Sequence, residues 1–489
     1  MNVSRRFFLA GAGAFGAFGA FNGCRLMPGF ASGKPKLKFG VVSDVHVRLS
    51  NKGVGLYEPN DTKTFIHTLE WFRDQGVDAV MIAGDIADHG MVKEMEAVAA
   101  AWFKVFPNDK APDGRTVTRL FVCGNHDWEG FNYGKFAEKV FPDSVRRAKE
   151  ILRTDYKGNW ERIWHEAYAP VWMKTVNGYS FIGGHWSADK CRGKEELGIV
   201  GVPEFFAAHA KELDPSRPFF YFQHPHPKNT CYGSEAWGRD IGTATKALSP
   251  FSNAIAFSGH SHYTLTDERS VWQGAFTSIG TASLRYTCHF PISQNKMDDC
   301  KFIVPKQSTF DNRQGMLVSV YDDQVAIQRR DFVRDASLGS DWVMPLPVAE
   351  NKPFAFATRA AALGTPAFSV FSKVVAAKTT QPAKDAKAKP TERVKLDFPS
   401  ATATQTRAFE YEITIEGKNA TGATKAKSCR IEAFGYHRSP TDKEAVGPQT
   451  CSFARAGLPA GATDVRFTVT PLSSHGLKGK PLVSNWVAL

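Results

Sequence analysis

The sequence lacks any long apolar run beyond its first residues. No later segment approaches the roughly 20 consecutive apolar residues that a membrane-spanning helix needs, so we expect no transmembrane segment there. It also lacks the skewed composition of a disordered or fibrous chain, since 43% of its residues are hydrophobic and 22% are charged. Because single cores rarely grow beyond roughly 250–300 residues, a chain of 489 residues should contain more than one domain.

The middle of the chain lacks net charge, although the whole carries a formal +12. Residues 37–370 contain 38 bases and 39 acids, whereas residues 1–36 contribute +5 without a single acid and residues 371–489 contribute +8. Proteins that track nucleic-acid phosphates concentrate Lys and Arg along their sites, so this distribution disfavours nucleic acid as the partner. It leaves open a contact between the C-terminal part and an anionic surface or polymer.

The N-terminus has the features of an export signal. Arg5 and Arg6 precede a short run of Gly, Ala and Phe that ends near Phe21, and the setting resembles a twin-arginine (Tat) signal. We expect residues 1–33 to be this signal and the mature protein to be periplasmic or secreted. Lipid anchoring at Cys24 is the less favoured alternative, because Phe and Asn are poor residues for a lipoprotein box.

The eight cysteines can pair if the protein reaches an oxidising compartment. Cys123 ends an apolar strand and is expected to be a buried thiol, while Cys24 leaves with the signal or takes lipid. Sequence does not fix connectivity, but three disulfides fit the remaining cysteines. The pairs would be Cys191–Cys231, Cys288–Cys300 and Cys429–Cys451.

Apolar strands alternate with amphipathic helices in the first half of the chain, which predicts an α/β fold. In open α/β sheets the working site lies beyond the carboxyl ends of the strands, and polar clusters follow the strands here. Strands are expected over residues 37–42, 79–83, 118–123, 179–182, 219–222 and 254–257, helices around 65–72 and 93–105, and a hairpin over 316–329.

Helical periodicity fades near residue 350, and short turn-bounded strands predict an all-β sandwich over residues 355–489. These strands are expected at 393–398, 409–415, 429–434 and 465–470. The final stretch resembles the last hairpin of fibronectin type III modules. A polar loop with Lys378, Lys384, Lys387 and Lys389 lies either between the domains or inside this sandwich, and a solvated loop is favoured over a polyanion site.

Five clusters carry the chemistry. In order, they are Asp44-x-His46, Gly84-Asp85-x-x-Asp88, Gly124-Asn125-His126-Asp127, His224 and Gly259-His260-x-His262. Mixed nitrogen and oxygen ligands suit Zn, Mn or Fe. Taken alone, a cluster can have a purely structural role: Asp88 could cap a helix, and His224 could be a loop histidine. Five in this order, each closing an apolar strand, favour a metal site.

These clusters resemble the metallo-dependent (calcineurin-like) phosphoesterase family over residues 37–348. The resemblance implies a two-sheet β-sandwich flanked by helices, and two divalent metal ions (Mn, Zn or Fe). One ion would be held by Asp44, His46, Asp85 and His262, and the other by Asp85, Asn125, His224 and His260. His126 would stabilise the transferring phosphoryl group or protonate the leaving oxygen, and Asp127 would orient His126.

The resemblance predicts an enzyme that hydrolyses phosphodiester or phosphomonoester bonds of a small phosphate ester by attack of a metal-bridging hydroxide, and the N-terminal signal predicts that this enzyme is exported. Asp88 stands where purple acid phosphatases have a tyrosine ligand, so a tyrosinate–iron centre is not expected. His226, Arg239 and Arg285 are candidate substrate contacts, and His185-Trp186 is either a pocket wall or a packed pair. The alternative function is a surface-binding or adhesion protein with a structural or degenerate metal site.

Overall fold

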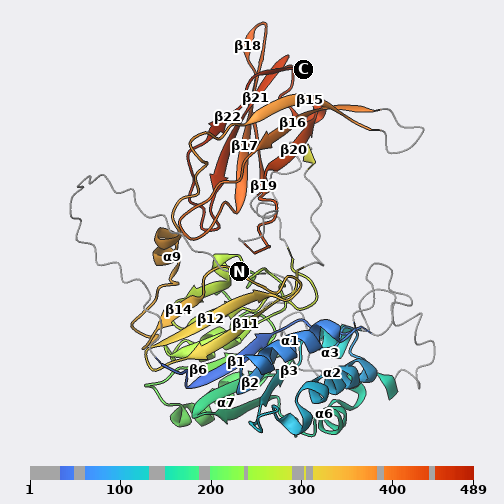
Figure 1. The fold of residues 1–489 in the computed structure, drawn as a ribbon, viewed down its shortest axis with the longest axis vertical. Coiled ribbons are helices and arrows are strands. Elements are labelled where there is room, and N and C mark those ends of the chain that lie inside the picture. The colour runs from blue at the N-terminus through green and yellow to red at the C-terminus, as the bar shows by residue number, and fades with distance from the viewer. Residues whose placement is uncertain are drawn as a thin grey trace, which may run out of the picture.

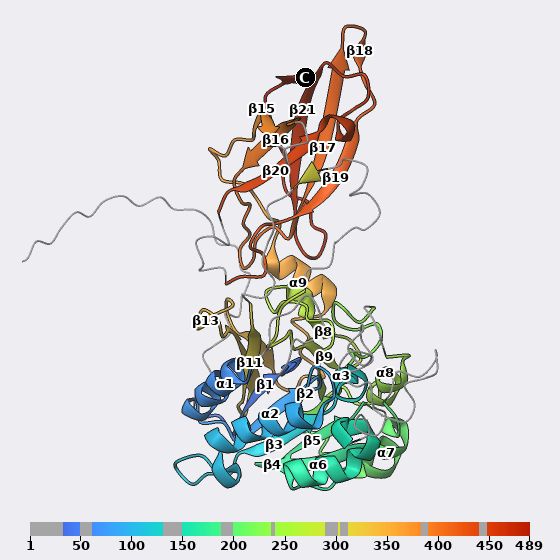
Figure 2. The same ribbon diagram turned by 90° about the vertical axis from the view of Figure 1, so that its right-hand side faces the viewer.

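The computed structural model describes residues 33–48, 61–130, 149–186, 199–235, 240–288, 302–303, 312–382, 390–439 and 447–489. Residues 1–32, and with them most of the expected signal and Cys24, lie outside these ranges. Two units follow one another along the long axis of the molecule (Figures 1 and 2). The N-terminal unit comprises the described residues between 33 and 348, except the short strand at 302–303, and the C-terminal unit those between 364 and 489. Helix α9 (Phe356–Leu363) joins them.

The first sheet of the N-terminal unit is seven-stranded, with the order β13-β12-β11-β1-β2-β3 and with β14 paired to β12. Strands β1, β2 and β3 are parallel, and the hairpin β11–β12 adds to β1 antiparallel, as the sequence predicts. The strands are β1 (Leu37–Val42), β2 (Ala79–Ala83), β3 (Thr118–Val122), β11 (Gln314–Val320), β12 (Gln324–Asp331), β13 (Ala336–Ser337) and β14 (Trp342–Pro345).

The second sheet has six strands in the order β4-β5-β6-β7-β9-β8. Its centre, β5-β6-β7-β9, is parallel, and the two edge strands are antiparallel. The strands are β4 (Val171–Val176), β5 (Tyr179–Gly184), β6 (Phe219–Phe222), β7 (Ala254–Ser258), β8 (Val271–Gln273) and β9 (Thr277–Gly280).

The two sheets face each other across an apolar core. Alternate residues of β1 point into it, because successive side chains of a strand leave on opposite faces. Phe39 packs edge-on against Phe181 and Phe220, with ring centroids 5.1 and 4.8 Å away. The outer face of the first sheet packs against α1 (Lys63–Asp74), α2 (Val92–Val105) and α6 (Tyr156–Trp164), and that of the second against α7 (Val202–His209) and α8 (Thr243–Leu248). The predicted two-sheet sandwich flanked by helices is confirmed.

The C-terminal unit is all-β, as predicted, and its two sheets enclose a separate core. One sheet has the order β10-β20-β16-β15, and the other contains β18-β17-β21-β22 with β19 on β17 and β23 on β21. The strands are β10 (Phe302–Ile303), β15 (Val375–Gln381), β16 (Thr391–Phe398), β17 (Glu410–Asn419), β18 (Gly422–Ala423), β19 (Lys427–Glu432), β20 (Gln449–Ala454), β21 (Asp464–Leu472), β22 (Leu482–Val483) and β23 (Val487–Ala488).

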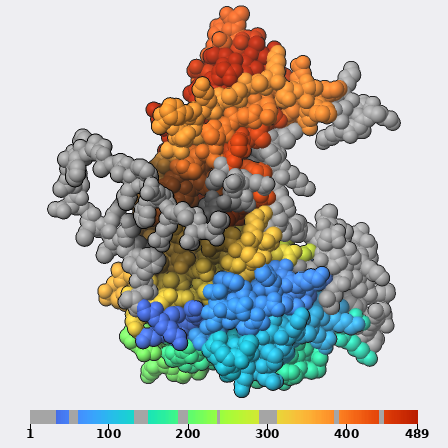
Figure 3. All heavy atoms as spheres, in the orientation of Figure 1, coloured from blue at the N-terminus to red at the C-terminus, as the bar shows by residue number. Residues whose placement is uncertain are grey.

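Two features of this unit were not apparent from the sequence. Strand β10 comes from the segment between β9 and β11, yet it pairs with β20 of the C-terminal unit. Lys378 of the lysine-rich segment belongs to β15 and so lies within the unit rather than between the domains, whereas Lys384, Lys387 and Lys389 lie outside the described residues. Figure 3 shows the C-terminal unit seated above the N-terminal unit.

The predicted Cys429–Cys451 disulfide is wrong. Both side chains are buried in the C-terminal core, but β19 and β20 belong to different sheets and no disulfide joins the two sulfurs. Cys123 is a buried thiol, as expected. Cys231 and Cys288 are also thiols, and their expected partners Cys191 and Cys300 lie outside the described residues.

No helix among the described residues combines the length and the apolar character needed to cross a bilayer.

Candidate metal centre

All seven predicted metal ligands lie in the segments that follow strands of the two sheets. Asp44 and His46 follow β1, Asp85 follows β2, and Asn125 begins the short helix α3 (Asn125–Glu129) after β3. His224 follows β6, and His260 and His262 follow β7. Because these strand ends meet at one edge of the sandwich, residues up to 218 positions apart converge there.

The backbone at this edge is strained. Five of the predicted ligands adopt positive φ angles, a region that non-glycine residues rarely occupy. The angles are +50° at Asp44, +46° at His46, +53° at Asp85, +70° at His260 and +56° at His262. Each such residue costs on the order of 1–3 kcal/mol and persists only where its surroundings hold it, so this concentration marks a functional site.

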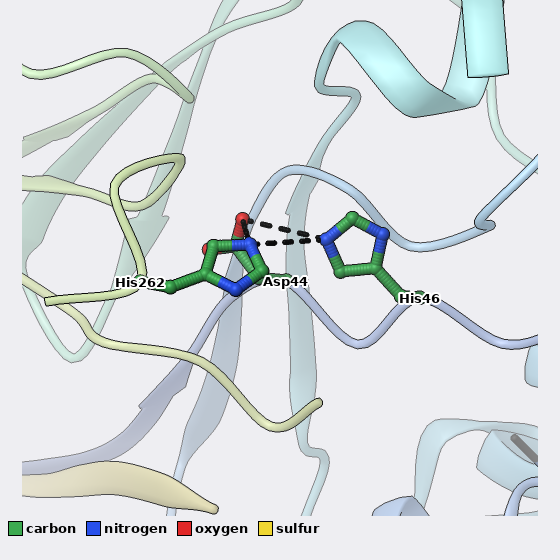
Figure 4. A group of neighbouring side chains, drawn as sticks. All are labelled: Asp44, His46 and His262. Atoms are coloured by element: carbon green, nitrogen blue, oxygen red, sulfur yellow. Dashed lines mark hydrogen bonds and ion pairs between the residues drawn. The ribbon is translucent and has the colours of Figure 1, made fainter. Parts of the chain in front are cut away.

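Asp44, His46 and His262 form the first cluster (Figure 4). Nε2 of His262 lies 2.9 Å from Oδ1 of Asp44, and Nε2 of His46 lies 3.7 Å from the same oxygen. The two Nε2 atoms face each other at 3.2 Å. Two imidazole nitrogens and a carboxylate oxygen aimed at one point are a donor set that fits Zn, Mn or Fe.

Asp85, His224 and His260 form the second cluster. Nε2 of His224 lies 3.0 Å from Oδ2 of Asp85 and 3.2 Å from Nδ1 of His260. Oδ2 of Asp85 is also 3.6 Å from Nε2 of His46, which belongs to the first cluster. Asp85 therefore lies between the two clusters, in the place of a carboxylate shared by two ions. Asn125 is buried beside Asp85. The next residue in the chain, His126, donates its backbone amide to Oδ1 of Asp85.

The charges of the clusters depend on one another. Burial favours neutral groups, but the imidazoles of His262 and His224 hold the pKa of Asp44 well below its usual range. Burial alone would lower the pKa of His46 and of His224. Hydrogen bonds to Asp44 and Asp88 nevertheless raise the pKa of His46 to about 10, and the negative charges of Asp85 and Asp44 raise the pKa of His224 to about 9. The buried carboxylates are thus anionic and require positive charge. Protons or bound cations can both supply it, so the residues present fit divalent metal ions.

His126 lies at the edge of the centre with 27% of its side chain exposed. Its ring meets the His46 ring edge-on at 4.5 Å, and Nδ1 lies 2.7 Å from the backbone oxygen of Asp88. A carbonyl oxygen only accepts, so Nδ1 carries a proton, and burial lowers the pKa of the ring. In the neutral ring Nε2 is then the nitrogen without a proton.

The predicted role of Asp127 in orienting His126 is wrong. The Asp88 carbonyl takes the ring nitrogen that Asp127 was expected to hold. The carboxylate of Asp127 instead accepts from three backbone amides, those of Ile86 at 3.2 Å, Ala87 at 2.7 Å and Gly124 at 2.7 Å. Asp127 therefore fixes the turns that follow β2 and β3, and acts on the shape of the site rather than on the proton of His126.

Asp88 is a site residue that the sequence interpretation missed. It does not cap helix α2, whose N-cap is Met91. Its carboxylate lies 3.0 Å from Nδ1 of His46 and forms an ion pair with Arg48. A carboxylate behind a ligating imidazole fixes the ring and its tautomer, so Asp88 orients His46. The sequence feature that could have indicated this role was the second carboxylate of the Gly84-Asp85-x-x-Asp88 cluster.

The three predicted substrate contacts have different outcomes. His226 is buried, and its ring nitrogens lie 2.7 Å from the hydroxyls of Ser258 and Ser261, so it cannot meet a substrate and that prediction is wrong. Arg239 lies outside the described residues. Arg285 lies near the charge of Asp88 and directly before Tyr286, whose ring is 4.4 Å from that of His262. Its contact with a substrate stays a prediction.

His185 is a packed residue, whereas Trp186 lies beside the metal centre. His185 is buried and packed: its Nδ1 accepts from the amide of Cys123 at 3.0 Å, and its Nε2 lies 3.2 Å from the indole nitrogen of Trp172. Trp186 is also buried, but its ring lies 6.3 and 6.2 Å from the rings of His224 and His260. The tryptophan thus packs against the second cluster, and the histidine supports the strand behind it.

Comparison with known proteins agrees with this architecture. Residues 37–264 match the family model of the calcineurin-like phosphoesterases. This part of the chain is therefore a calcineurin-like phosphoesterase domain, which confirms that part of the resemblance. The family is dinuclear and metal-dependent, in keeping with the two His/Asp clusters. A search of curated proteins found no match.

Several solved structures are similar at low identity. A predicted phosphoesterase from Streptococcus pneumoniae is 12% identical, with 63% of this chain and 97% of that chain covered and a TM-score of 0.25. Purple acid phosphatase PPD1 from yellow lupin (Lupinus luteus) is also 12% identical, with 63% and 54% covered and a TM-score of 0.39. Zinc-complexed Vps29 from Entamoeba histolytica is 10% identical, with 63% and 99% covered and a TM-score of 0.28.

Proposed function

We propose that the protein is an exported phosphoesterase that uses two divalent metal ions, Mn, Zn or Fe, to hydrolyse the diester or monoester bond of a small phosphate ester. One observation carries the proposal: two His/Asp clusters face each other at the strand ends, and Asp85 lies between them. When bound, such ions supply Lewis acidity to a phosphoryl oxygen and lower the pKa of water at the site.

The chain's own residues would divide the work. Asp44, His46 and His262 would hold one ion, and His224, His260 and Asn125 the other, with Asp85 shared between them. Asp88 would keep Nδ1 of His46 directed away from the ion, so that Nε2 is the ligating atom. The carboxylate of Asp127, which accepts from backbone amides of both loops, would hold the loops after β2 and β3 in fixed positions relative to each other.

His126 would act on the leaving group. Hydrolysis forms a P–O bond from water, breaks the ester P–O bond and releases an alkoxide that must take up a proton. Nδ1 of His126 donates to the Asp88 carbonyl, so proton transfer to the leaving group would use Nε2. An anionic phosphate beside Nε2 would raise the low pKa of this imidazole, and the ring would then deliver that proton to the leaving oxygen.

The test is substitution of one ligand from the middle of the site and one from its edge. Asp85→Ala or His260→Ala should abolish hydrolysis of chromogenic phosphodiesters and monoesters, while circular dichroism shows an intact fold. Metal analysis of the wild-type protein should give two equivalents. One equivalent or none, with no turnover, would instead favour the binding or adhesion protein. Retained activity in either purified variant would refute the assignment of the two clusters.

Export and surface contact are part of this proposal. The twin-arginine motif within residues 1–33 supports a periplasmic or secreted location, and the charge of +8 in residues 371–489 supports contact between the C-terminal unit and an anionic surface or polymer. The two-sheet C-terminal unit is compatible with a fibronectin type III-like module. Fusion of residues 1–33 to a reporter protein tests the signal, since replacing Arg5 and Arg6 by Lys should stop its export.

A further inference from the structure

The loop that follows the predicted ligand His262 leads directly into the contact between the two units. The hydroxyl of Thr266 donates to the backbone oxygen of Tyr436 at 2.6 Å. The hydroxyl of Thr264 lies 3.1 Å from Oε1 of Gln314 and 3.4 Å from the backbone oxygen of His437, so it can donate to either. Two side chains within four residues of His262 therefore bind the C-terminal unit.

Gln314, at the start of β11, joins the same two loops from the sheet side. It is fully buried, and its Oε1 accepts from the amide of Leu265 at 2.8 Å. Its Nε2 donates to the backbone oxygen of His437 at 2.9 Å. One side-chain amide thus bridges the loop after His262 and the 435–438 loop of the C-terminal unit, each through a buried backbone group that needs a partner.

The 435–438 loop is itself held in place by Arg407. Nη2 of this buried arginine lies 2.9, 2.7 and 2.8 Å from the backbone oxygens of Gly435, Tyr436 and Arg438. A charged guanidinium fixes several carbonyls at once, so the acceptors that meet Thr264 and Thr266 have a defined direction. The C-terminal unit therefore presents an ordered surface to the loop.

His262 needs such support, because its backbone is strained at φ +56°. On one side, Nδ1 lies 3.0 Å from the backbone oxygen of Tyr286, and the carbonyl of His262 accepts from the amide of Cys288 at 2.8 Å. On the other side, Tyr263 donates its amide to Oγ of Ser261 at 3.3 Å and stacks on Tyr232 at 4.7 Å, and Thr264 and Thr266 beyond it meet the C-terminal unit. A metal ligand must stay within about 0.5 Å of its productive position, so both supports contribute to its placement.

We propose that the 435–438 loop of the C-terminal unit is a positioning element of the metal centre, acting through Thr264 and Thr266 on His262. This inference rests on the proposed function, since it concerns the ion held by Asp44, His46 and His262. It assigns the C-terminal unit a task in the chemistry of the N-terminal unit. Thr264 and Thr266 are positioning residues, and neither belongs to the ligand set.

The test is the double variant Thr264→Val/Thr266→Val in the full chain, titrated with Mn²⁺ by calorimetry. Valine keeps the shape of threonine and removes both hydroxyls. The fold should persist, because the carbonyl of Tyr436 keeps Arg407 as a donor and that of His437 keeps Gln314. One of the two binding steps should weaken by about 10-fold, as expected for loss of support behind a ligand, and the other should not change.

Three controls separate positioning from general destabilisation. Thr264→Ser/Thr266→Ser keeps the hydroxyls and should restore wild-type affinity. Thr68→Val removes a buried hydroxyl of helix α1, which donates to the carbonyl of Thr64 at 2.8 Å, and should leave both steps unchanged. In a His262→Ala background, the valine pair should cause no further loss, because residues that act through one ligand are not additive.

Each outcome decides between the claims. Two unchanged binding steps in the valine variant would overturn the positioning role, and so would a further loss of affinity in the His262→Ala background or a failure of the serine pair to restore binding. These results leave the proposed function standing as long as the wild-type protein binds two equivalents of Mn²⁺. Failure of the wild-type protein to bind two equivalents would refute the dinuclear centre itself.

Discussion

Gly84→Ala should disable the candidate metal centre through a single methyl group. Gly84 lies between β2 and Asp85 and adopts φ +90°. A Cβ atom at this position would lie 2.4 Å from Nδ1 and 2.6 Å from Cγ of the His224 ring. The ring cannot yield freely, because Nδ1 lies 2.8 Å from the backbone oxygen of Ala83 and Nε2 lies 3.0 Å from Asp85.

The magnitude follows from these contacts. Ordinary van der Waals contact of a Cβ begins at 3.4 Å, so the His224 ring or the backbone at residue 84 must move by about 1 Å. A misplacement of about 1 Å in a catalytic site can reduce the rate on the order of 100-fold. The left-handed backbone adds a stability cost of roughly 1–2 kcal/mol for alanine. We therefore expect about 100-fold slower ester hydrolysis and a weakened metal-binding step.

Gly114→Ala is the matched control. Gly114 has a similar φ of +82°, but a Cβ there would meet no atom within 4 Å. It should lose stability in urea unfolding by a similar amount while keeping metal binding and turnover. The assay is hydrolysis of a chromogenic phosphodiester at saturating Mn²⁺, together with Mn²⁺ titration of both variants. Equal turnover and equal metal affinity in the two variants would refute the packing of Gly84 against His224 as a condition of the site.

Two further predictions concern buried groups outside the ligand set. Burial lowers the pKa of His185 to about 3, with a smaller contribution from Lys174, whereas the unfolded imidazole titrates near 6.5. The unfolded state therefore takes up the proton first as pH falls below about 6.5, and stability should drop by about 1.4 kcal/mol per pH unit from this group. His185→Phe should flatten the dependence of the urea unfolding free energy on pH between 6.5 and 4, and an unchanged slope would contradict this. Cys429 and Cys451 should resist iodoacetamide in the folded protein and react with it after unfolding without a reductant; a requirement for reductant would show that a disulfide joins them.

The predicted strands and the candidate ligands were accessible from sequence because their signals are local. An apolar run such as Leu37–Val42 favours a buried strand wherever it lies, and the polar residues that follow it must lie at the strand end. Parallel strands of one sheet end at a common edge, so Asp44, Asp85 and Asn125 could be expected to meet before any distance was known. The same logic extends to the ligands after β6 and β7.

The roles around the ligands were not accessible in this way. The expectation that Asp127 orients His126 was wrong because three backbone amides compete for its carboxylate, and their direction depends on how the turns after β2 and β3 pack. His226 resembled a loop residue facing substrate, but two serines from the end of β7 and the loop beyond it enclose its ring. Both outcomes depend on contacts between segments far apart in the chain.

Local patterns were enough to predict the α/β alternation, the order of the five clusters and the all-β character of the C-terminal unit, because periodicity and residue type act over a few neighbouring residues. The placement of Cys429 and Cys451 on different sheets, and the contact of Thr264 and Thr266 with the 435–438 loop, became apparent only in the folded chain. These pairings join residues up to 173 positions apart. They depend on how sheets and units pack, a property that no local pattern encodes.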